Sequence, residues 1–214
     1  MFSRTANRVA LAWSVLLVVV TARSALAVPF PIPLVPEDFS NLGVVGPASP
    51  YLLEAYSYEG FAGTVASQAF DLVSGDYLYL YQVDNSGPEV VEKLVVFPFY
   101  ALVGAGYLTG GEPSGFLTGG VVPLGATYDP NVPGAPTVGF GYYVTTGNQI
   151  PAGQHGATLY LISSGAPILG EAHVIDGGAG TVDVYVSPEP TAALLTAVGL
   201  VSLLVRRRRR AVRA

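Results

Sequence analysis

Tyr77-Leu78-Tyr79-Leu80-Tyr81-Gln82-Val83 is the stretch of sequence that decides the fold class. Side chains alternate between the two faces of a β-strand, so the three tyrosines share one face with Val83, and the two leucines share the other with Gln82. Both faces are largely apolar, which favours a strand covered on both sides. The stretch therefore predicts a central strand with a tyrosine-bearing face.

Other runs rich in β-branched and aromatic residues lie on either side of this strand in the sequence. Most of them are separated by glycine, proline, asparagine or aspartate, which favour turns, and none shows sustained helical periodicity. We expect an antiparallel β-sandwich or jelly-roll-like single domain over residues 51–187. Its strands are predicted near residues 51–58, 63–72, 76–84, 90–99, 138–146, 157–163, 168–175 and 181–186.

Two segments depart from this pattern. Residues 28–50 hold six prolines, which fix the backbone and remove donors, so we expect an extended entry arm there, ending at most as an edge strand. Residues 101–136 are rich in glycine and proline, and we expect short strands with bulges or long loops. A phosphate-binding loop is not predicted, because Gly104-Ala105-Gly106 lacks the third glycine of the dinucleotide fingerprint and no Gly-Lys-Ser/Thr occurs.

The N-terminus has the features of an export signal. Arg4 and Arg8 precede an apolar run over residues 9–20, and Ala25-Leu26-Ala27 forms a small-residue cleavage site. We predict that residues 1–27 form a signal helix that is removed after Ala27.

The C-terminus combines three features in a fixed order. Pro188-Glu189-Pro190 is followed by an uncharged apolar run over residues 191–205 and then by five adjacent arginines. The run predicts a transmembrane helix over residues 191–205. This helix is short, because a permanent span needs about 20 residues. The arginines are expected to stay on the cytoplasmic side, together with the rest of residues 206–214. They are Arg206, Arg207, Arg208, Arg209 and Arg210.

This order resembles the PEP-CTERM sorting signal of exported bacterial proteins, here over residues 188–214 with its box at Pro188, Glu189 and Pro190. The resemblance implies recognition by an exosortase-type membrane transpeptidase, cleavage near the box and delivery to the cell surface or an extracellular matrix. Anchoring by the C-terminal helix would then be transient. An ordinary single-pass C-terminal anchor is the alternative interpretation.

The body resembles uncharacterised exported proteins that carry the same tail. The resemblance rests on Gly60-Phe61-Ala62-Gly63-Thr64-Val65, on the strand and turn over residues 77–85, and on Ile175-Asp176-Gly177-Gly178. It implies no known activity.

Charge is distributed unevenly along the chain. Nine of the ten basic residues lie in the two predicted sorting segments, which leaves only Lys93 between residues 28 and 187. That segment holds fourteen acidic residues, for a formal charge of −13. This sign opposes binding to nucleic acid and to anionic lipid, so a nucleic-acid partner is excluded. The chain has no cysteine, and its core must therefore stabilise it without disulfides.

No catalytic constellation is evident. His155 and His173 are the two histidines, and serines such as Ser163 and Ser164 are available as nucleophiles. No Gly-x-Ser-x-Gly motif accompanies them. We expect a protein that is not an enzyme and that carries no cofactor.

Metal sites have only partial support. His155, Glu171, His173 and Asp176 would converge if their strands were neighbours, but zinc spacing motifs are missing. Calcium binding is left open, although no Asp-x-Asp-x-Asp-Gly loop occurs and turn formation explains the candidate pairs. These pairs are Asp71 with Asp76, Asp84 with Asn85, and Asp129 with Asn131.

Two functions are compatible with the sequence. The first is a structural or interaction protein of the cell surface or of an exopolysaccharide matrix. The second is a carbohydrate-binding module, with or without the assistance of calcium. Its sugar platform would be Tyr77, Tyr79 and Tyr81, or Tyr142 and Tyr143. Burial of these rings between two sheets would favour the structural function, whereas an open groove would favour sugar binding.

Overall fold

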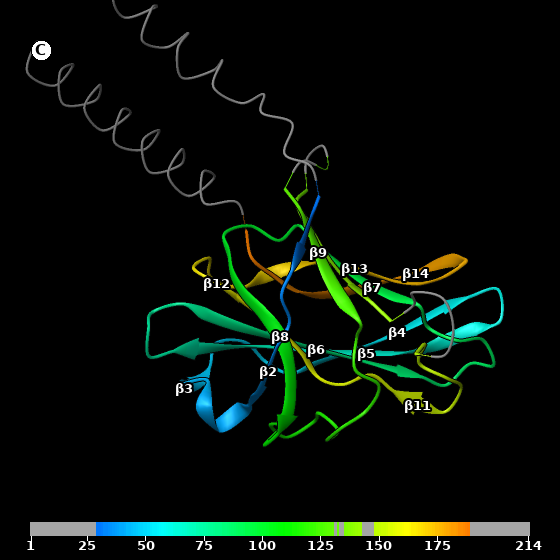
Figure 1. The fold of residues 1–214 in the computed structure, drawn as a ribbon, viewed down its shortest axis with the longest axis horizontal. Helices are drawn as coiled ribbons and strands as arrows, with labels where there is room; N and C mark the ends of the chain where they lie inside the picture. The colour runs from blue at the N-terminus through cyan, green and yellow to red at the C-terminus, as the bar shows by residue number, and fades with distance from the viewer. Residues whose placement is uncertain (1–28, 131, 133–134, 143–147, 189–214) are drawn as a thin grey trace, which may run out of the picture.

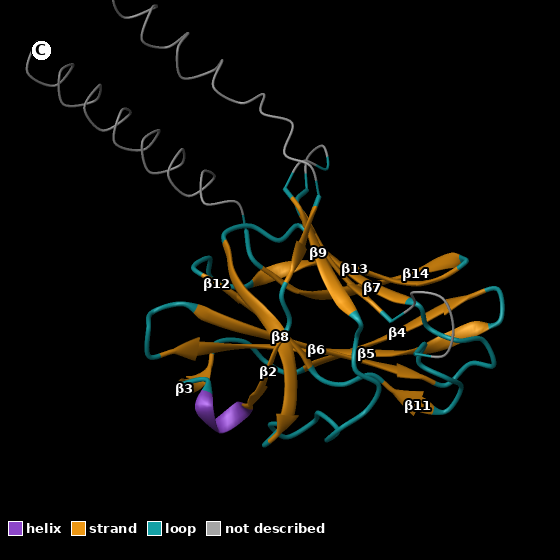
Figure 2. Cartoon of the chain, in the orientation of Figure 1, coloured by secondary structure: helices purple, strands orange, loops and turns teal. Residues whose placement is uncertain are grey.

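The computed structural model describes residues 29–130, 132, 135–142 and 148–188. These residues form an all-β body whose one helical element is a single 3-10 turn, η1 (Phe39–Asn41), drawn in purple in Figure 2. The predicted signal helix and C-terminal transmembrane helix lie outside the described residues. Within the described part of the chain, no helix has the length and apolar character needed to span a membrane.

The strands belong to two sheets, and Figure 1 shows β7, β13 and β14 of one sheet above β5 and β6 of the other. The six-stranded sheet has the order β1 (Phe30–Ile32), β9 (Gly125–Asp129), β10 (Thr137–Gly141), β7 (Lys93–Phe97), β13 (Ile168–Asp176), β14 (Gly178–Val186). The eight-stranded sheet has the order β2 (Val35–Asp38), β8 (Leu102–Gly110), β12 (Leu159–Ser163), β6 (Tyr77–Asn85), β5 (Phe61–Leu72), β3 (Val44–Pro47). In addition, β4 (Leu52–Tyr58) pairs with β5, and β11 (Gln154–His155) pairs with β6.

The main core lies between the two sheets and contains side chains from both, among them Tyr81 of β6 and Val184 of β14. A second apolar cluster covers the opposite face of the eight-stranded sheet, where Phe39 of η1 and Phe116 pack over Leu78. β6 is therefore covered on both faces. This arrangement confirms the prediction of a central strand.

The proline-rich segment is part of the fold and is not a separate arm. It supplies β1 at the edge of one sheet and both β2 and β3 at the edges of the other. Short edge strands suit proline, which cannot donate a ladder hydrogen bond. The pairing of β2 with β8 is parallel, so the expectation of a purely antiparallel body is wrong at this edge.

The glycine-rich segment contains a longer strand than expected, because β8 extends over nine residues. One of its glycines has a packing role. A side chain at Gly106 would collide with the ring of Tyr160 and with the Val35 carbonyl, and the Tyr160 hydroxyl donates to that carbonyl at 3.0 Å. Glycine at this position permits β2, β8 and β12 to approach closely, and it is not a sign of a loop.

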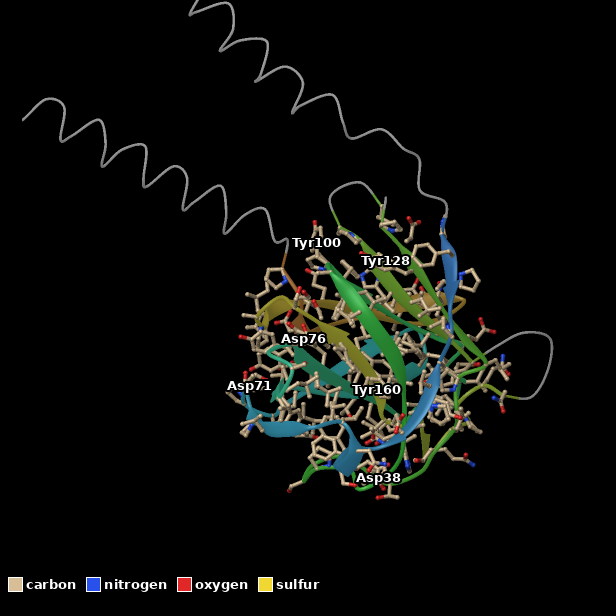
Figure 3. The ribbon with its side chains drawn as sticks, turned by 60° about the vertical axis from the view of Figure 1, so that its left-hand side comes forward. Asp38, Asp71, Asp76, Tyr100, Tyr128 and Tyr160 are labelled. Carbon is tan, nitrogen blue, oxygen red and sulfur yellow. The ribbon has the colours of Figure 1, made fainter. Side chains whose placement is uncertain are left out.

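The chain enters and leaves the body at the same end, through opposite edges of the six-stranded sheet. Figure 1 shows the chain entering β1 and leaving β14 at the top of the view, and Figure 3 shows Tyr100 and Tyr128 at that same end. At the entry, the rings of Phe30 and Tyr128 lie edge to face with centroids 5.6 Å apart. At the exit, the Tyr100 amide donates to the Ser187 carbonyl at 3.2 Å. A tyrosine thus contacts the chain at each of the two places.

Candidate functional site

The tyrosine face of β6 is closed to ligands. Tyr79 and Tyr81 are fully buried between the sheets, and Tyr77 is partly buried against the same core. A sugar ring has no access to stack on them, so the predicted sugar platform is wrong for these strand residues. Tyr142 is also fully buried, and Tyr143 lies outside the described residues.

The buried tyrosines instead satisfy backbone groups inside the body. The Tyr81 hydroxyl donates to the carbonyl of Tyr185 in β14 at 2.6 Å, which joins the two sheets. The Tyr79 hydroxyl donates to the carbonyl of Gly165 at 2.5 Å. Burial raises the pKa of Tyr81 well above its usual value, and the neighbouring Tyr79 adds to the shift. These hydroxyls therefore act as neutral structural donors.

The described histidines are not paired with Ser163. His155 of β11 lies opposite Asp84, whereas Ser163 lies opposite Tyr77 at the other end of β6. Seven residues of strand separate these two positions, which is roughly 24 Å at about 3.4 Å per residue. His173 lies in the other sheet, edge to face with Phe97 at 4.6 Å. Neither histidine can activate Ser163 in this arrangement.

The expected metal ligands also remain separate. His155 belongs to the eight-stranded sheet, whereas Glu171, His173 and Asp176 all belong to β13 of the six-stranded sheet. The described residues contain no group of three or more acidic, histidine or cysteine side chains placed to hold a metal ion.

Among the proposed calcium pairs, Asp76 accepts a hydrogen bond from the Ser74 hydroxyl at 3.0 Å within the β5–β6 turn. This contact is the turn role that its sequence context indicates. The partner proposed for Asp129, Asn131, is outside the described residues.

Acidic side chains gather where β13 and the segment before β7 come together. Burial raises the pKa of the Asp176 carboxyl, and the charges of Glu92 and Glu89 raise it further. Gln149 donates to a Glu92 carboxylate oxygen at 3.0 Å. The body thus keeps part of its negative charge concentrated near one end of β13.

An open groove of about 440 Å³, lined by both apolar side chains and polar backbone atoms, lies between the β1–β2 connection and the residues around the start of β9. Tyr107 of β8 contributes an aromatic ring to its wall, and proline and aliphatic side chains make up much of the rest. The groove contains no charged side chain in its lining. Its chemistry does not define a substrate.

The exit of the chain from the body is a hydrogen-bonded site directly beside a predicted functional segment. β14 ends at Val186, Ser187 is fully buried, and Pro188, the first residue of the predicted box, is the last described residue. Glu189, Pro190 and the arginines from Arg206 to Arg210 lie outside the described residues, as do Ala25 and Ala27.

Five residues from separate segments converge at this exit, and we call them the exit cluster: Tyr79, Tyr100, Ser163, Gly165 and Ser187. The hydroxyls of Ser163 and Ser187 are 2.7 Å apart. The Ser163 hydroxyl also donates to the Tyr100 carbonyl at 2.9 Å and accepts from the Gly165 amide at 3.1 Å. The cluster thereby links β6, β12, the β7–β8 connection and the end of β14.

The direction of the bond between the two serines follows from counting protons. A serine hydroxyl has one proton and two lone pairs, and Ser163 gives its proton to Tyr100. With that proton given to Tyr100, the Ser187 hydroxyl is the donor available for the bond to Ser163, although the 2.7 Å contact has the geometry for either direction. Burial raises the pKa of Tyr79, while its contact with the Ser187 hydroxyl acts in the opposite direction. Such a buried network of several polar groups favours one geometry over its alternatives.

The exit cluster is not predictable from the local sequence. Ser163 and Ser187 are 24 positions apart, and serine at the end of a strand is common. The one available signal is that Ser163 ends β12 and Ser187 directly follows β14, because serine at a strand end can be either a turn residue or a buried one.

Comparisons with protein-family models, curated proteins and solved structures gave no match for this chain.

Proposed function

We propose that the chain is an exported structural or interaction protein of the cell surface or an exopolysaccharide matrix, cut and sorted at its C-terminal Pro-Glu-Pro box. One observation carries this proposal. The described strands begin at Phe30, just after the predicted cleavage at Ala27, and end at Val186, just before Pro188. Removal of both predicted sorting segments would therefore leave every described strand in place.

The body suits an extracellular location. We assign it to the jelly-roll-like sandwich class because one apolar cluster contains residues from both sheets. Its formal charge of −13 keeps molecules apart in solution, and its core supplies stability without disulfides. The proposed partners are an exosortase-type transpeptidase, the membrane during transient anchoring, and extracellular polysaccharide.

A non-enzymatic role accounts best for the described polar residues. The separation of Ser163 from both histidines supports this interpretation, because nucleophilic catalysis requires the base within hydrogen-bonding reach. The alternative of a carbohydrate-binding module has lost its strand platform, since Tyr79 and Tyr81 are buried. No other observation in the described residues favours it over the structural role.

The test is the intact mass of the protein recovered from the surface and medium of its native host. We expect a species that begins at Val28 and ends near Pro188. A species that retains the arginine tail would contradict the proposal and would indicate a plain membrane anchor. Deletion of Arg206 to Arg210 should in addition weaken retention and processing, whereas unchanged delivery would argue against the assigned role of the tail.

A further inference from the structure

The body binds the chain as far as Ser187, the residue that directly precedes the predicted box. Val186 pairs with Ile168 at the end of the β13–β14 ladder. The next residue, Ser187, is bonded through both its carbonyl, which accepts from the Tyr100 amide, and its hydroxyl, which contacts Ser163. Pro188 follows at once and has no amide proton to offer. No spacer therefore separates the folded body from the box.

This placement restricts how a processing enzyme can approach. An enzyme that binds an extended peptide contacts backbone groups and side chains on both sides of the bond it cuts. At Val186 and Ser187 these groups are already engaged within the body, and the Ser187 side chain is fully buried. The residues available to the enzyme begin at Pro188 unless the exit cluster opens.

We propose that the exit cluster withholds the chain up to Ser187 from the processing enzyme, and thereby controls both the position and the rate of cleavage. The scissile bond is confined to Pro188 or beyond, and opening of the cluster limits the rate. This inference rests on the proposed function, because it requires processing at the box. Within that function, Ser163, Gly165 and Ser187 are positioning residues.

Gly165 gives the most specific way to disturb the cluster. A side chain at this position would overlap the Ser187 hydroxyl and come within 3.2 Å of the Pro188 ring. Gly165→Ala must therefore displace the Ser187 hydroxyl from its place beside Ser163. Gly125→Ala is the matched control, since a side chain there meets nothing within 4 Å.

Ser163→Ala removes the hydroxyl at the centre of the cluster. Its matched control is Ser49→Ala, because Ser49 also has a buried hydroxyl that accepts from a backbone amide, that of Ala69 at 2.8 Å. Ser49 lies between β3 and β4, and its hydrogen bonds join it to Pro50, Gln68 and Ala69, away from the exit cluster. If both serine variants lose similar thermal stability, a difference in processing between them reports on the exit alone.

A third variant leaves the cluster intact. Insertion of about six Gly/Ser residues between Ser187 and Pro188 adds roughly 20 Å of extended chain. It gives the enzyme free residues before the box without changing any residue of the body, so it keeps the test valid if a cluster variant fails to fold.

The experiment follows the full chain in its native host, with the rate of conversion measured by pulse–chase and the new C-terminus by intact mass. We expect one wild-type species ending at Pro188 or later. Conversion should be severalfold faster for Gly165→Ala, Ser163→Ala and the spacer variant, and unchanged for both controls. Equal rates in wild type and the spacer variant, or a wild-type terminus at or before Ser187, would overturn the inference and leave the proposed function standing. A wild-type chain that is never cut would overturn both.

Discussion

The chain enters the body through short edge strands and leaves it through a long, firmly held one. β1 and β2 have three and four residues, and Phe30 and Val35 within them remain about half exposed. β14 has nine residues, pairs along its whole length with β13, and buries Val182, Val184 and Val186. The two strands are opposite edges of the same sheet, yet the C-terminal one makes far more interactions with the body.

The polar contacts repeat this contrast. The Tyr185 carbonyl in β14 accepts from the fully buried Tyr81, and the Tyr185 amide donates to Ser67 of β5 at 3.4 Å. At the entry, the comparable bond is donated by the Tyr160 hydroxyl to the carbonyl of Val35, a residue of β2 that is about half exposed. The stronger hold is thus on the side where the proposed anchor attaches, and the following experiments measure how unequal the two sides are.

Removal of whole strands should give the largest difference. Truncation after Gly177 deletes β14 and exposes the core side of β13, whereas deletion of residues 28–33 removes β1 alone. Burial of three valines contributes about 5–9 kcal/mol, which is comparable with the total stability of a typical domain. We expect the first variant to be unfolded and the second to retain a cooperative unfolding transition.

Circular dichroism and urea unfolding of the two variants provide the measurement. Loss of the cooperative transition in the β1 deletion, or its retention without β14, would reverse the comparison.

A rise in pH should break the bond between Tyr160 and Val35 at the entry before the bond between Tyr81 and Tyr185 in β14. Burial raises the pKa of Tyr160 to about 12, with a smaller contribution from Glu37, and burial raises the pKa of Tyr81 well above its usual value. Because the folded-state pKa is raised, the contribution of each tyrosine to stability is intact below about pH 10 and is lost as the pH rises through its folded-state pKa. The bond to β2 should therefore fail near pH 12, before the bond to β14.

A difference titration of tyrosinate absorbance between wild type and Tyr160→Phe isolates this step, and near-ultraviolet circular dichroism follows the core. Ionisation of Tyr160 only together with loss of the core signal would show that the entry is held as firmly as the exit.

Removal of single hydroxyls should give an intermediate effect. Tyr81→Phe leaves the Tyr185 carbonyl without its buried donor, which costs about 1–3 kcal/mol. Tyr160→Phe should cost less, because water can reach the more exposed Val35 and replace the lost donor. Free energies of unfolding from urea titrations test this order. Equal losses would show that burial does not distinguish the two bonds.

Surface substitutions should give the smallest effect. Pro31 of β1 and Thr181 of β14 are both exposed. Pro31→Ala should lower stability by less than about 1 kcal/mol, mainly by freeing the unfolded chain. Thr181→Ala should change it by no more than about 0.5 kcal/mol. Thermal unfolding measures both, and a large loss at Pro31 would mean that β1 matters more than its contacts indicate.

Local patterns predicted the interior of the fold well. The alternation through Leu78 and Tyr79 indicated a strand covered on both faces, and the strands near residues 159–163 and 178–186 lie close to where β-branched runs placed them. Such patterns work because burial on a given face imposes a period of two on the sequence.

The edges and the exit could not be predicted, because their causes are not local. Gly106 leaves room for the ring of Tyr160, a residue far away in the sequence. From the sequence alone, the same glycine resembles a loop residue. The parallel pairing of β2 depends on where the chain passes from one sheet to the other. The bond between Ser163 and Ser187 joins two ordinary serines through tertiary packing alone.

The position of the exit also has a mechanical consequence. The nine paired positions between β13 and β14 lead from the exit to the opposite end of β14, where Tyr58 lies beside Gly178. If the anchored chain is pulled while a partner grips the body beside β1, the β13–β14 bonds are loaded one after another and the strand unzips. If the partner grips the β4–β5 turn at Glu59 and Gly60, the same pull acts along the strands and loads these bonds together in shear. The force that the attachment withstands is thus set by which end of the body the partner binds.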